Sequence, residues 1–234
     1  MTVAIILAGG LGTRLREVVP DLPKPMALIN QRPFLEYLLD YWAAQNIEKF
    51  ILIVGYKYLD IQNHFGDFYR NIPIEYFVEA SPLGTGGALV QISQQLTQPY
   101  LLLNGDTFAT VDLRDLQEFH KESQSDLTML LFKADQQNRY GAVDVDNRGV
   151  IRGLLTAKSE VNSLANAGVY YINPQIFNNV LFVFGQKYSL EDQIIPIVIQ
   201  EGCCVMGHQQ DIEFIDIGIP SDYEKSVHFF SGKV

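Results

Sequence analysis

The first segment of the chain passes from an apolar strand directly into glycines. Residues 3–15 read VAIILAGGLGTRL, and the fully apolar run Val3–Leu7 is followed at once by Gly9 and Gly10. A short apolar run without polar alternation is typical of a central strand in a parallel sheet. Glycines after such a strand let a phosphate oxygen approach main-chain N–H groups closely, because no Cβ is in the way. The segment therefore predicts an α/β fold with a candidate anion site at its first turn.

Buried strands and amphipathic helices then alternate along the first 135 residues. We expect strands at 3–7, 50–54, 74–77, 100–103 and 127–132, and helices at 33–45, 58–65, 85–96 and 113–122. This alternation predicts an α/β fold with a mostly parallel central sheet and helices on both faces, similar to Rossmann-like folds.

The pattern changes after residue 135. Strand-like segments at 142–145, 150–155 and 168–172 follow one another and are separated by turns, and a helix at 190–200, strands at 205–208 and 213–217 and a helix at 221–230 complete the chain. This order predicts a small β-rich lobe rather than another strand–helix–strand unit. We expect one domain over 1–234, in which 1–135 and 136–234 differ in character.

Composition and charge limit the classes of protein that fit. The 234 residues are 47% hydrophobic and carry a net charge of −10, which argues against a general nucleic-acid binder but allows a nucleotide substrate. The N-terminus lacks the basic region of a signal peptide, and no apolar stretch approaches the roughly 20 residues that cross a bilayer. We therefore expect a cytoplasmic protein that is not embedded in a membrane.

The glycine turn matches neither of two familiar phosphate loops. It is not a P-loop, because no Gly-Lys-Ser/Thr follows at the required spacing, and the third glycine of a dinucleotide fingerprint is replaced by Leu15. An isolated glycine turn can also serve packing alone. Two cations favour a phosphate site: Arg14 follows the glycines directly, and Lys24 lies between two prolines that restrict its backbone. The plainer alternative is that both are solvated surface charges.

Two aspartates are candidate metal ligands. Asp106 and Asp216 each follow an apolar strand beside a glycine, so both are expected at the carboxyl edge of the sheet, where ligands of open α/β sheets bind. Mg²⁺ prefers oxygen ligands and takes one or two carboxylates together with phosphates and waters. An Asp after a strand is also a common turn former or helix cap.

The joint order of motifs resembles the sugar-1-phosphate nucleotidyltransferases. The segment LAGGLGTRLR…PKPM looks like the signature of that family, and further matches follow in the family's order at SPLGTGGAL (81–89), LLLNGDT (101–107), YGAV (140–143), NAGVYYI (166–172), SLEDQIIP (189–196) and FIDIGIP (214–220). The resemblance covers residues 3 to about 225. Within the family, the chain is most similar to guanylyltransferases that act on D-glycero-α-D-manno-heptose 1-phosphate.

The resemblance implies a reaction and a set of site residues. It implies that residues 1–135 mainly bind the nucleotide and 136–234 mainly bind the sugar, and that GMP passes from GTP to the sugar 1-phosphate with release of pyrophosphate. Arg14 and Lys24 are the implied catalytic residues. The implied nucleotide contacts are Leu7, Ala8, Gly9, Gly10, Gly12, Thr13, Arg14, Lys24, Gly84, Thr85, Gly86 and Asp106. The implied sugar-phosphate contacts are Gly141, Lys158, Asn166 and Glu191, and Asp106 and Asp216 are the implied ligands of Mg²⁺.

The sequence departs from the family pattern at one motif and leaves alternatives open. Lys158 stands in Ala-Lys-Ser, where the family commonly has Glu-Lys-Pro around the sugar-phosphate lysine. We expect no C-terminal β-helix, and a homo-oligomer is compatible with the sequence. Alternatives are another base and sugar pair, such as GDP-mannose or a dTDP-, UDP- or CDP-hexose, or a non-catalytic nucleotide-sugar sensor on the same fold. A glycosyltransferase is a weaker alternative, because the Asp-x-Asp at 144–146 fits a β-hairpin.

Overall fold

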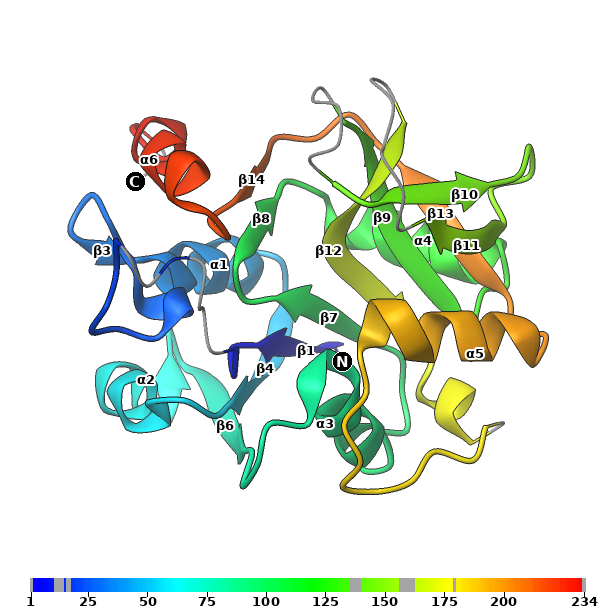
Figure 1. Cartoon of the computed structure of the whole chain (residues 1–234), viewed down its shortest axis with the longest axis horizontal. Helices are drawn as coiled ribbons and strands as arrows, with labels where there is room; N and C mark the ends of the chain where they lie inside the picture. The colour runs from blue at the N-terminus through cyan, green and yellow to red at the C-terminus, as the bar shows by residue number, and fades with distance from the viewer. Residues whose placement is uncertain are drawn as a thin grey trace. The chain divides into compact units, whose positions relative to one another are not determined.

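The computed structural model describes residues 2–10, 15, 18–134, 140–155, 163–178 and 180–232. These residues form two compact units (Figure 1). Unit 1 comprises Met1–Pro82, Leu103–Ala109 and Glu213–Val234, and unit 2 comprises Leu83–Leu102 and Thr110–Ile212. Strand β7 (Tyr100–Asn104) contributes its first three residues to unit 2 and its last two to unit 1.

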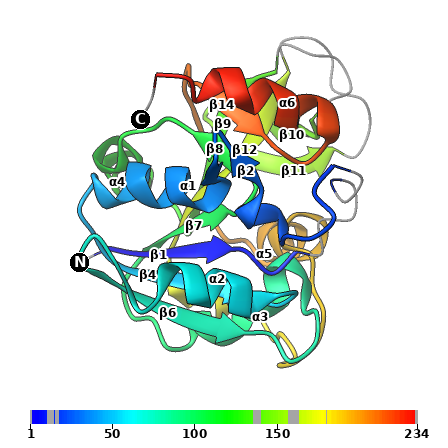
Figure 2. The same cartoon turned by 90° about the vertical axis from the view of Figure 1, so that its left-hand side faces the viewer.

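Unit 1 is built around parallel strands. Its elements are β1 (Thr2–Leu7), η1 (Lys24–Met26), β2 (Leu28–Ile29), β3 (Arg32–Pro33), α1 (Phe34–Ala43), β4 (Ile47–Val54), α2 (Tyr58–Phe65), β5 (Phe68–Tyr69), β6 (Ile72–Val78), β8 (Thr107–Ala109), β14 (Phe214–Asp216) and α6 (Pro220–Phe229). Strand β4 pairs in parallel with β1 and with β6, and β5 pairs antiparallel with β6. Helices α1 and α2 lie on the same side of these strands in Figures 1 and 2, which buries that side of the sheet.

The apolar pattern of the sequence explains this core. Ile5 and Ile6 of β1 are fully buried, as an apolar run without alternation predicts. The apolar positions that predicted the first helix all face the core of unit 1, each 1% exposed or less: Phe34, Leu35, Leu38, Leu39 and Trp42. The hydrophobic spacing therefore identified both the strand and the face of the helix that covers it.

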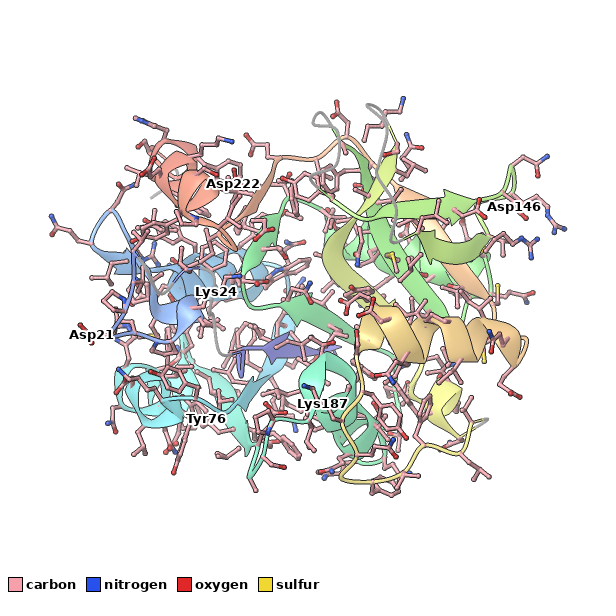
Figure 3. All side chains as sticks on the ribbon, viewed as in Figure 1. Asp21, Lys24, Tyr76, Asp146, Lys187 and Asp222 are labelled. Carbon is pink, nitrogen blue, oxygen red and sulfur yellow. The ribbon has the colours of Figure 1, made fainter. Side chains whose placement is uncertain are left out.

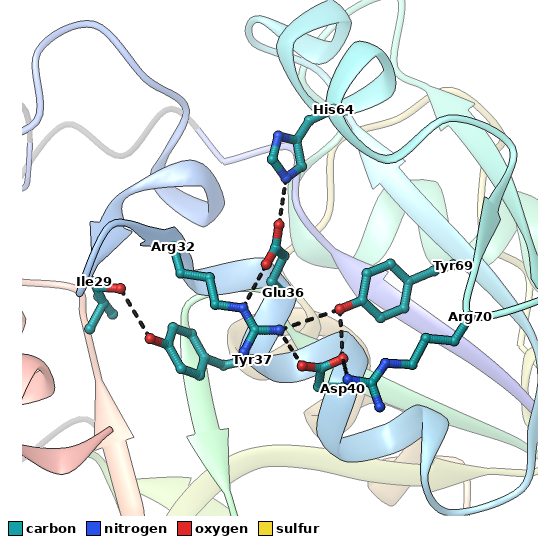
Figure 4. Close-up of polar contacts among 8 residues, drawn as sticks. All are labelled: Ile29, Arg32, Glu36, Tyr37, Asp40, His64, Tyr69 and Arg70. Atoms are coloured by element: carbon teal, nitrogen blue, oxygen red, sulfur yellow. Dashed lines mark hydrogen bonds and ion pairs between the residues drawn. The ribbon is translucent and has the colours of Figure 1, made fainter. Parts of the chain in front are cut away.

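Arg32 of β3 is the centre of a polar cluster that fixes the start of α1 (Figure 4). Its Nε donates to Glu36 Oε2 over 2.6 Å, and its Nη2 pairs with Asp40 Oδ2. Glu36 and Asp40 are four residues apart, so they lie on one face of α1 and one guanidinium reaches both. Partial burial acts to raise the pKa of Glu36, but hydrogen bonds from Arg32 and His64 outweigh it and the pKa is lowered.

The same cluster connects α1 to α2 and β5. His64 Nε2 of α2 lies 2.6 Å from Glu36 Oε1, and the Tyr69 hydroxyl of β5 donates to Asp40 Oδ1 over 2.6 Å. Arg70 Nη2 pairs with that same Asp40 oxygen over 2.7 Å (Figure 4). These contacts fix the helices of unit 1 to the connections between its strands.

Unit 2 contains a mixed sheet. Its elements are α3 (Gly84–Ser93), α4 (Leu113–Glu122), β9 (Leu127–Lys133), β10 (Ala142–Val145), β11 (Ile151–Leu155), β12 (Leu164–Ile172), η2 (Pro174–Phe177), η3 (Leu190–Ile194), α5 (Ile195–Gln200) and β13 (Val205–Gln209). Strands β11, β10, β12 and β9 are antiparallel neighbours in that order, and β13 pairs in parallel with β9. The segment 144–146 belongs to the β10–β11 hairpin, as expected.

The expected fold class is confirmed, with differences in detail. The helices α2 and α4 and the strand β10 have the predicted bounds, whereas the short strands β2, β3, β5 and β8 were not predicted. The helix expected over 190–200 begins as the π-helical turn η3 and becomes α-helical only at Ile195. The expected division into a nucleotide-binding part (1–135) and a sugar-binding part (136–234) does not coincide with the bounds of the two compact units. This division stays a prediction. Among the described residues, no helix is both long and apolar enough to span a membrane.

A buried histidine lies under the sheet of unit 2. His120 of α4 is 7% exposed, and its Nδ1 lies 2.9 Å from Thr128 Oγ1 and 3.0 Å from Ser125 Oγ. Burial lowers the pKa of His120 to about 4, and the charge of Asp126 opposes this shift only in part. The imidazole is therefore neutral in the folded protein near pH 7.

We predict that His120 makes the folded protein sensitive to acid. The unfolded chain takes up the proton near pH 6.5 and the folded chain only near pH 4, so stability is lost as the pH falls between these values. Between pH 7 and pH 5 this group should cost about 2 kcal/mol of unfolding free energy. Urea unfolding at both pH values should show a smaller decrease for His120→Gln than for wild type. The control His228→Gln, at an exposed histidine, should match wild type; an unchanged decrease in His120→Gln would contradict the assignment.

Candidate active site

The carboxyl end of β1 is held by two neighbouring segments of unit 1. The Ala8 N–H donates to Ile53 O over 2.8 Å, and the Gly105 N–H donates to Leu7 O over 3.1 Å. Only glycine fits at 105, because a Cβ there would lie 2.4 Å from Leu7 O. The next residue, Asp106, is therefore fixed beside the end of the first strand.

The glycine turn after β1 is described only at its beginning. Gly9 is half-buried and Gly10 is exposed, so the main chain reaches the surface at this point. Gly12, Thr13 and Arg14 lie outside the described residues, and so does Lys158. The roles expected for these four residues stay predictions.

A short antiparallel ribbon in unit 1 carries both candidate metal ligands. Strand β14 pairs with β8 so that Asp216 lies opposite Thr107, which directly follows Asp106. The Ile217 N–H donates to Asp106 O over 3.0 Å, which joins the two aspartate segments through the main chain. The structure therefore brings together two residues that are 110 positions apart in the sequence.

Lys24 reaches this pair of aspartates. Its Nζ pairs with Asp106 Oδ2, and its side chain is only 10% exposed. Gly218 lies beside both Lys24 and Asp216: a Cβ on Gly218 would lie 2.7 Å from Asp216 Oδ1 and 3.2 Å from Lys24 Nζ. Lys24, Asp106 and Asp216 thus form one charged cluster in unit 1, which we call the Lys24 cluster.

The donor set of this cluster suits Mg²⁺. It offers two carboxylates, and Mg²⁺ typically takes one or two carboxylates and completes its shell with phosphates and waters. Among the described residues there is no group of three or more His, Cys, Asp or Glu side chains that could hold a metal.

Thr85 and its flanking glycines lie at the start of α3 in unit 2. Gly84 has a φ of +72°, and a Cβ there would lie 2.4 Å from Tyr188 O. The Gly86 N–H donates to the same carbonyl over 2.9 Å. These glycines thus let α3 pack directly on the segment around Tyr188, and the contact with a base that the family resemblance implies stays a prediction.

A chain of hydrogen bonds connects Thr85 with Asn166 and Glu191, two of the expected sugar contacts. The Thr85 hydroxyl accepts from the Leu190 N–H over 2.8 Å and donates to Glu191 Oε2 over 3.3 Å. The other carboxylate oxygen of Glu191 accepts from the Tyr170 hydroxyl over 3.0 Å, and that hydroxyl accepts from Asn166 Nδ2 over 2.6 Å. We call these residues the Glu191 relay.

Each donor in the Glu191 relay has a fixed direction. Asn166 Oδ1 accepts from the Gly168 N–H over 2.9 Å, which orients the amide so that its NH₂ faces Tyr170. Tyr170 has one hydroxyl proton and donates it to Glu191, whose two oxygens both act as acceptors. Asn166 and Glu191 are thus held in defined orientations before any ligand binds.

Sequence reasoning missed Tyr170, although the motif that contains it was recognised. The tyrosine is fully buried, and the register of β12 with β9 shifts between Asn166 and Tyr170. This irregularity contains Gly168 with a φ of +72° and brings residues four positions apart into contact. Gly141, the remaining expected sugar contact, is exposed and directly precedes β10, whose Ala142 pairs with Ala165 beside Asn166.

Comparison with known proteins places the chain in a family. The model of the nucleotidyl transferase family matches residues 3–231, and the chain belongs to this family. It is similar to two enzymes named D-glycero-α-D-manno-heptose 1-phosphate guanylyltransferase: one from Aneurinibacillus thermoaerophilus (41% identity, 95% of this chain and 96% of that one) and one from Campylobacter jejuni (38% identity, 94% and 96%). The crystal structure of HddC from Yersinia pseudotuberculosis is also similar, with a TM-score of 0.85 and 31% identity over 98% of this chain and all of that chain.

We predict that the Tyr170 hydroxyl stabilises unit 2 more than the Tyr100 hydroxyl does, because it makes hydrogen bonds to both Asn166 and Glu191, whereas Tyr100 bonds Ser93. Both tyrosines are fully buried, and the Tyr100 hydroxyl shares a 2.8 Å hydrogen bond with Ser93 Oγ. Tyr170→Phe should cost about 2–3 kcal/mol in urea unfolding, because it removes the donor to Glu191 Oε1 and the acceptor of Asn166 Nδ2, and Tyr100→Phe about 1 kcal/mol. Adding Glu191→Gln to Tyr170→Phe should cost less than the two single losses together. Equal losses for the two tyrosine variants, or additive losses in the double variant, would contradict the Glu191 relay.

Proposed function

We propose that this chain transfers GMP from GTP to D-glycero-α-D-manno-heptose 1-phosphate, yielding GDP-heptose and pyrophosphate. The observation that carries the proposal is the identity of 38–41% to guanylyltransferases of this name along nearly the whole of both chains. Two further observations support it: the structurally similar HddC has been crystallised with GMP-PN, and the Lys24 cluster offers the charges that phosphate transfer needs.

The reaction needs positioning and charge neutralisation rather than a protein nucleophile. An oxygen of the sugar phosphate attacks the α-phosphorus of GTP, and the bond from that phosphorus to the oxygen bridging to the β-phosphorus breaks, so that pyrophosphate leaves. The attacking oxygen is already an anion and needs no general base. The main obstacle is repulsion between two polyanions, which fixed cations reduce.

Lys24 is the described residue best placed to reduce this repulsion. We propose that its ammonium group moves from Asp106 to the α-phosphate and stabilises the charge that develops there during transfer. Its segment is rigid, because Pro23 and Pro25 restrict the backbone on both sides and Ala27 N–H donates to Lys24 O over 3.0 Å. A fixed backbone limits the positions that the ammonium group can take, which favours catalysis by positioning.

Asp106 and Asp216 are the residues that we propose to hold Mg²⁺. When bound, the ion would offset negative charge on the triphosphate and supply the charge neutralisation that two carboxylates cannot. Release of Lys24 from Asp106 frees a carboxylate oxygen for this purpose. The protein contributes two oxygen ligands on one short ribbon, held together by the main-chain bond from Ile217 to Asp106.

The remaining roles follow from family membership and are proposals. We propose Leu7, Ala8, Gly9 and Gly10 as contacts of base and ribose, Gly12, Thr13 and Arg14 as contacts of the β- and γ-phosphates, and Gly84, Thr85 and Gly86 as contacts of the base edge. Gly141, Asn166 and Glu191 would contact the sugar and Lys158 its phosphate. We further propose that the protein works in the cytoplasm; a homo-oligomer and the absence of nucleic-acid partners stay predictions.

Pyrophosphate release with a matrix of substrates tests the proposal. GTP, CTP, UTP, dTTP and ATP are each combined with D-glycero-α-D-manno-heptose 1-phosphate, mannose 1-phosphate and glucose 1-phosphate. The expected result is a kcat/KM that is highest for GTP with the heptose phosphate. A maximum at another pair would replace the assigned substrates, and no release with any pair would favour a nucleotide-sugar sensor.

We predict that Asp106→Asn removes both turnover and metal binding while leaving the fold intact. Turnover should fall about 10³-fold, because an amide cannot supply the charge of a carboxylate ligand. Mn²⁺ titration followed by electron paramagnetic resonance should show weaker binding, and circular dichroism should match wild type. Turnover near the wild-type level would overturn the assignment of Asp106 as a metal ligand.

We predict that Lys24→Met has the opposite effect on metal binding. Turnover should fall at least about 10²-fold, because the cation at the α-phosphate is lost. Mn²⁺ binding in the absence of nucleotide should become about fivefold tighter, because the ammonium group no longer pairs with Asp106. The same titration measures both variants. An unchanged Mn²⁺ affinity in Lys24→Met would show that this ion pair does not compete with the metal.

A further inference from the structure

The backbone that carries Lys24 continues into a small hairpin. Helix α1 contacts this hairpin: the Tyr37 hydroxyl donates to Ile29 O over 3.1 Å, and Arg32 pairs with Glu36 and Asp40. Ala27, whose N–H donates to Lys24 O, accepts in turn from the Phe34 N–H over 3.0 Å. Strands β2 and β3 between these residues form only two residue pairs, Leu28 with Pro33 and Ile29 with Arg32. A ladder of two pairs is too short to be stable alone, so the position of the Lys24 segment depends on what holds the hairpin.

Helix α6 and this hairpin are joined within unit 1 by two hydrogen bonds, each between a side chain and a main-chain carbonyl. The Tyr223 hydroxyl donates to Leu28 O over 2.6 Å, and Asn30 Nδ2 donates to Val227 O over 3.1 Å. Tyr223 and Val227 are four residues apart and therefore lie on one face of the helix. The two bonds run in opposite directions, one from helix to hairpin and one from hairpin to helix. Together they fix both the distance and the rotation of the hairpin on α6.

Helix α6 is itself firmly anchored. Phe230, directly after the helix, is 1% exposed, and its ring stacks on Tyr37 of α1 with centroids 4.1 Å apart. The same ring makes edge contacts with Phe34 of α1 and Phe108 of β8 at 6.1 Å and 5.1 Å. At its other end α6 begins at Pro220, two residues after Gly218. The anchored helix therefore connects the segment that contains Asp216 with the hairpin that follows Lys24.

We propose that Tyr223 and Asn30 are positioning residues that hold the Lys24 segment in register with Asp106 and Asp216. Neither side chain belongs to the Lys24 cluster, and both act through the main chain of the hairpin. The C-terminal helix thereby sets where the Lys24 ammonium group can reach. This inference rests on the proposed catalytic role of Lys24. It assigns the positioning of Lys24 to helix α6 rather than to the glycine turn.

Tyr223→Phe tests this inference, and Tyr76→Phe is its matched control. The Tyr76 hydroxyl donates to Gly66 O over 2.6 Å, so both variants lose one exposed hydroxyl–carbonyl bond of equal length, made by a half-buried tyrosine of unit 1. Tyr76 lies on β6, which is at the opposite end of unit 1 from α6 in Figures 1 and 2; Figure 3 labels Tyr76, Lys24 and Asp222 of α6. Tm should fall alike in both variants. Only Tyr223→Phe should lower kcat, about tenfold, with the KM for GTP within about twofold of wild type.

Asn30→Gly tests the second bond without disturbing the turn. Asn30 and Gln31 have φ values of +50° and +66°, the left-handed pair of a two-residue hairpin turn, which glycine adopts without strain. The variant removes the amide that reaches Val227 O, together with the hydrogen bond between Asn30 and the Tyr37 side chain. It should lower kcat in the same direction as Tyr223→Phe, again with little change in the KM for GTP. A kcat equal to wild type in both variants, or a kcat loss in Tyr223→Phe no larger than in Tyr76→Phe, would overturn the inference.

Hydrogen exchange separates this inference from the proposed function. Peptides covering residues 24–33 should exchange faster in Tyr223→Phe and Asn30→Gly than in wild type or Tyr76→Phe. If wild type releases no pyrophosphate with any substrate pair, the proposed function fails, and the exchange rates alone decide whether α6 holds the Lys24 segment. Unchanged exchange in this peptide in both variants would overturn the inference whether or not the enzyme is active.

Discussion

The ion pair between Lys24 and Asp106 is the interaction on which the arrangement of the candidate active site in unit 1 depends. A lysine ammonium with a side chain only 10% exposed is costly to bury without a partner, and two adjacent carboxylates repel one another without a cation. Lys24 meets both demands, since its Nζ contacts Asp106 and lies beside the Gly218 position that also adjoins Asp216. The one ammonium group of the cluster thus offsets one of its two carboxylate charges. Any ligand that binds there must replace the interactions that it breaks, which favours one carrying both a cation and phosphate charge.

The two polar clusters are built on different principles. The Lys24 cluster consists of charges brought together by main-chain pairing, because β8 and β14 form a ribbon and Gly105 approaches the end of β1. Its side chains can exchange partners without breaking that framework. The Glu191 relay instead consists of neutral and charged side chains joined by hydrogen bonds from Asn166 through Tyr170 to Glu191, which lies in a π-helical turn. Turns of this kind are common at functional sites. Rearranging one member of the relay would leave its neighbours without partners, so the relay is the stiffer of the two.

The sequence predicted elements with strong periodicity and left out those that depend on distant partners. The apolar runs in β1 and β4 and the amphipathic pattern of α4 were sufficient to identify those elements, because burial alone determines them. The strands β2, β3 and β8 have two or three residues and no period to detect. Their contacts come from distant segments: β8 pairs with β14, and side chains of α1 and α6 bond the hairpin of β2 and β3. The motifs likewise identified Asp106, Asp216, Asn166 and Glu191. Tyr170 was missed because its contact with Asn166 depends on an irregularity in β12 that the sequence marks only by Gly168.

Residues that sequence motifs identify differ in role from residues whose importance depends on contacts between distant segments. The residues that the motifs identify are charged groups or expected ligand contacts. Tyr223, Asn30 and Tyr170 instead orient other groups through hydrogen bonds. These orienting side chains are hydroxyl and amide groups, which also occur at many surface positions. Neither composition nor a motif therefore identifies them in the sequence. Their geometry does: each connects a main-chain carbonyl or a carboxylate to an element that is separately anchored. In a reaction between two polyanions, where catalysis consists mainly of placing charges, the groups that fix placement belong to the functional description as much as the charges themselves.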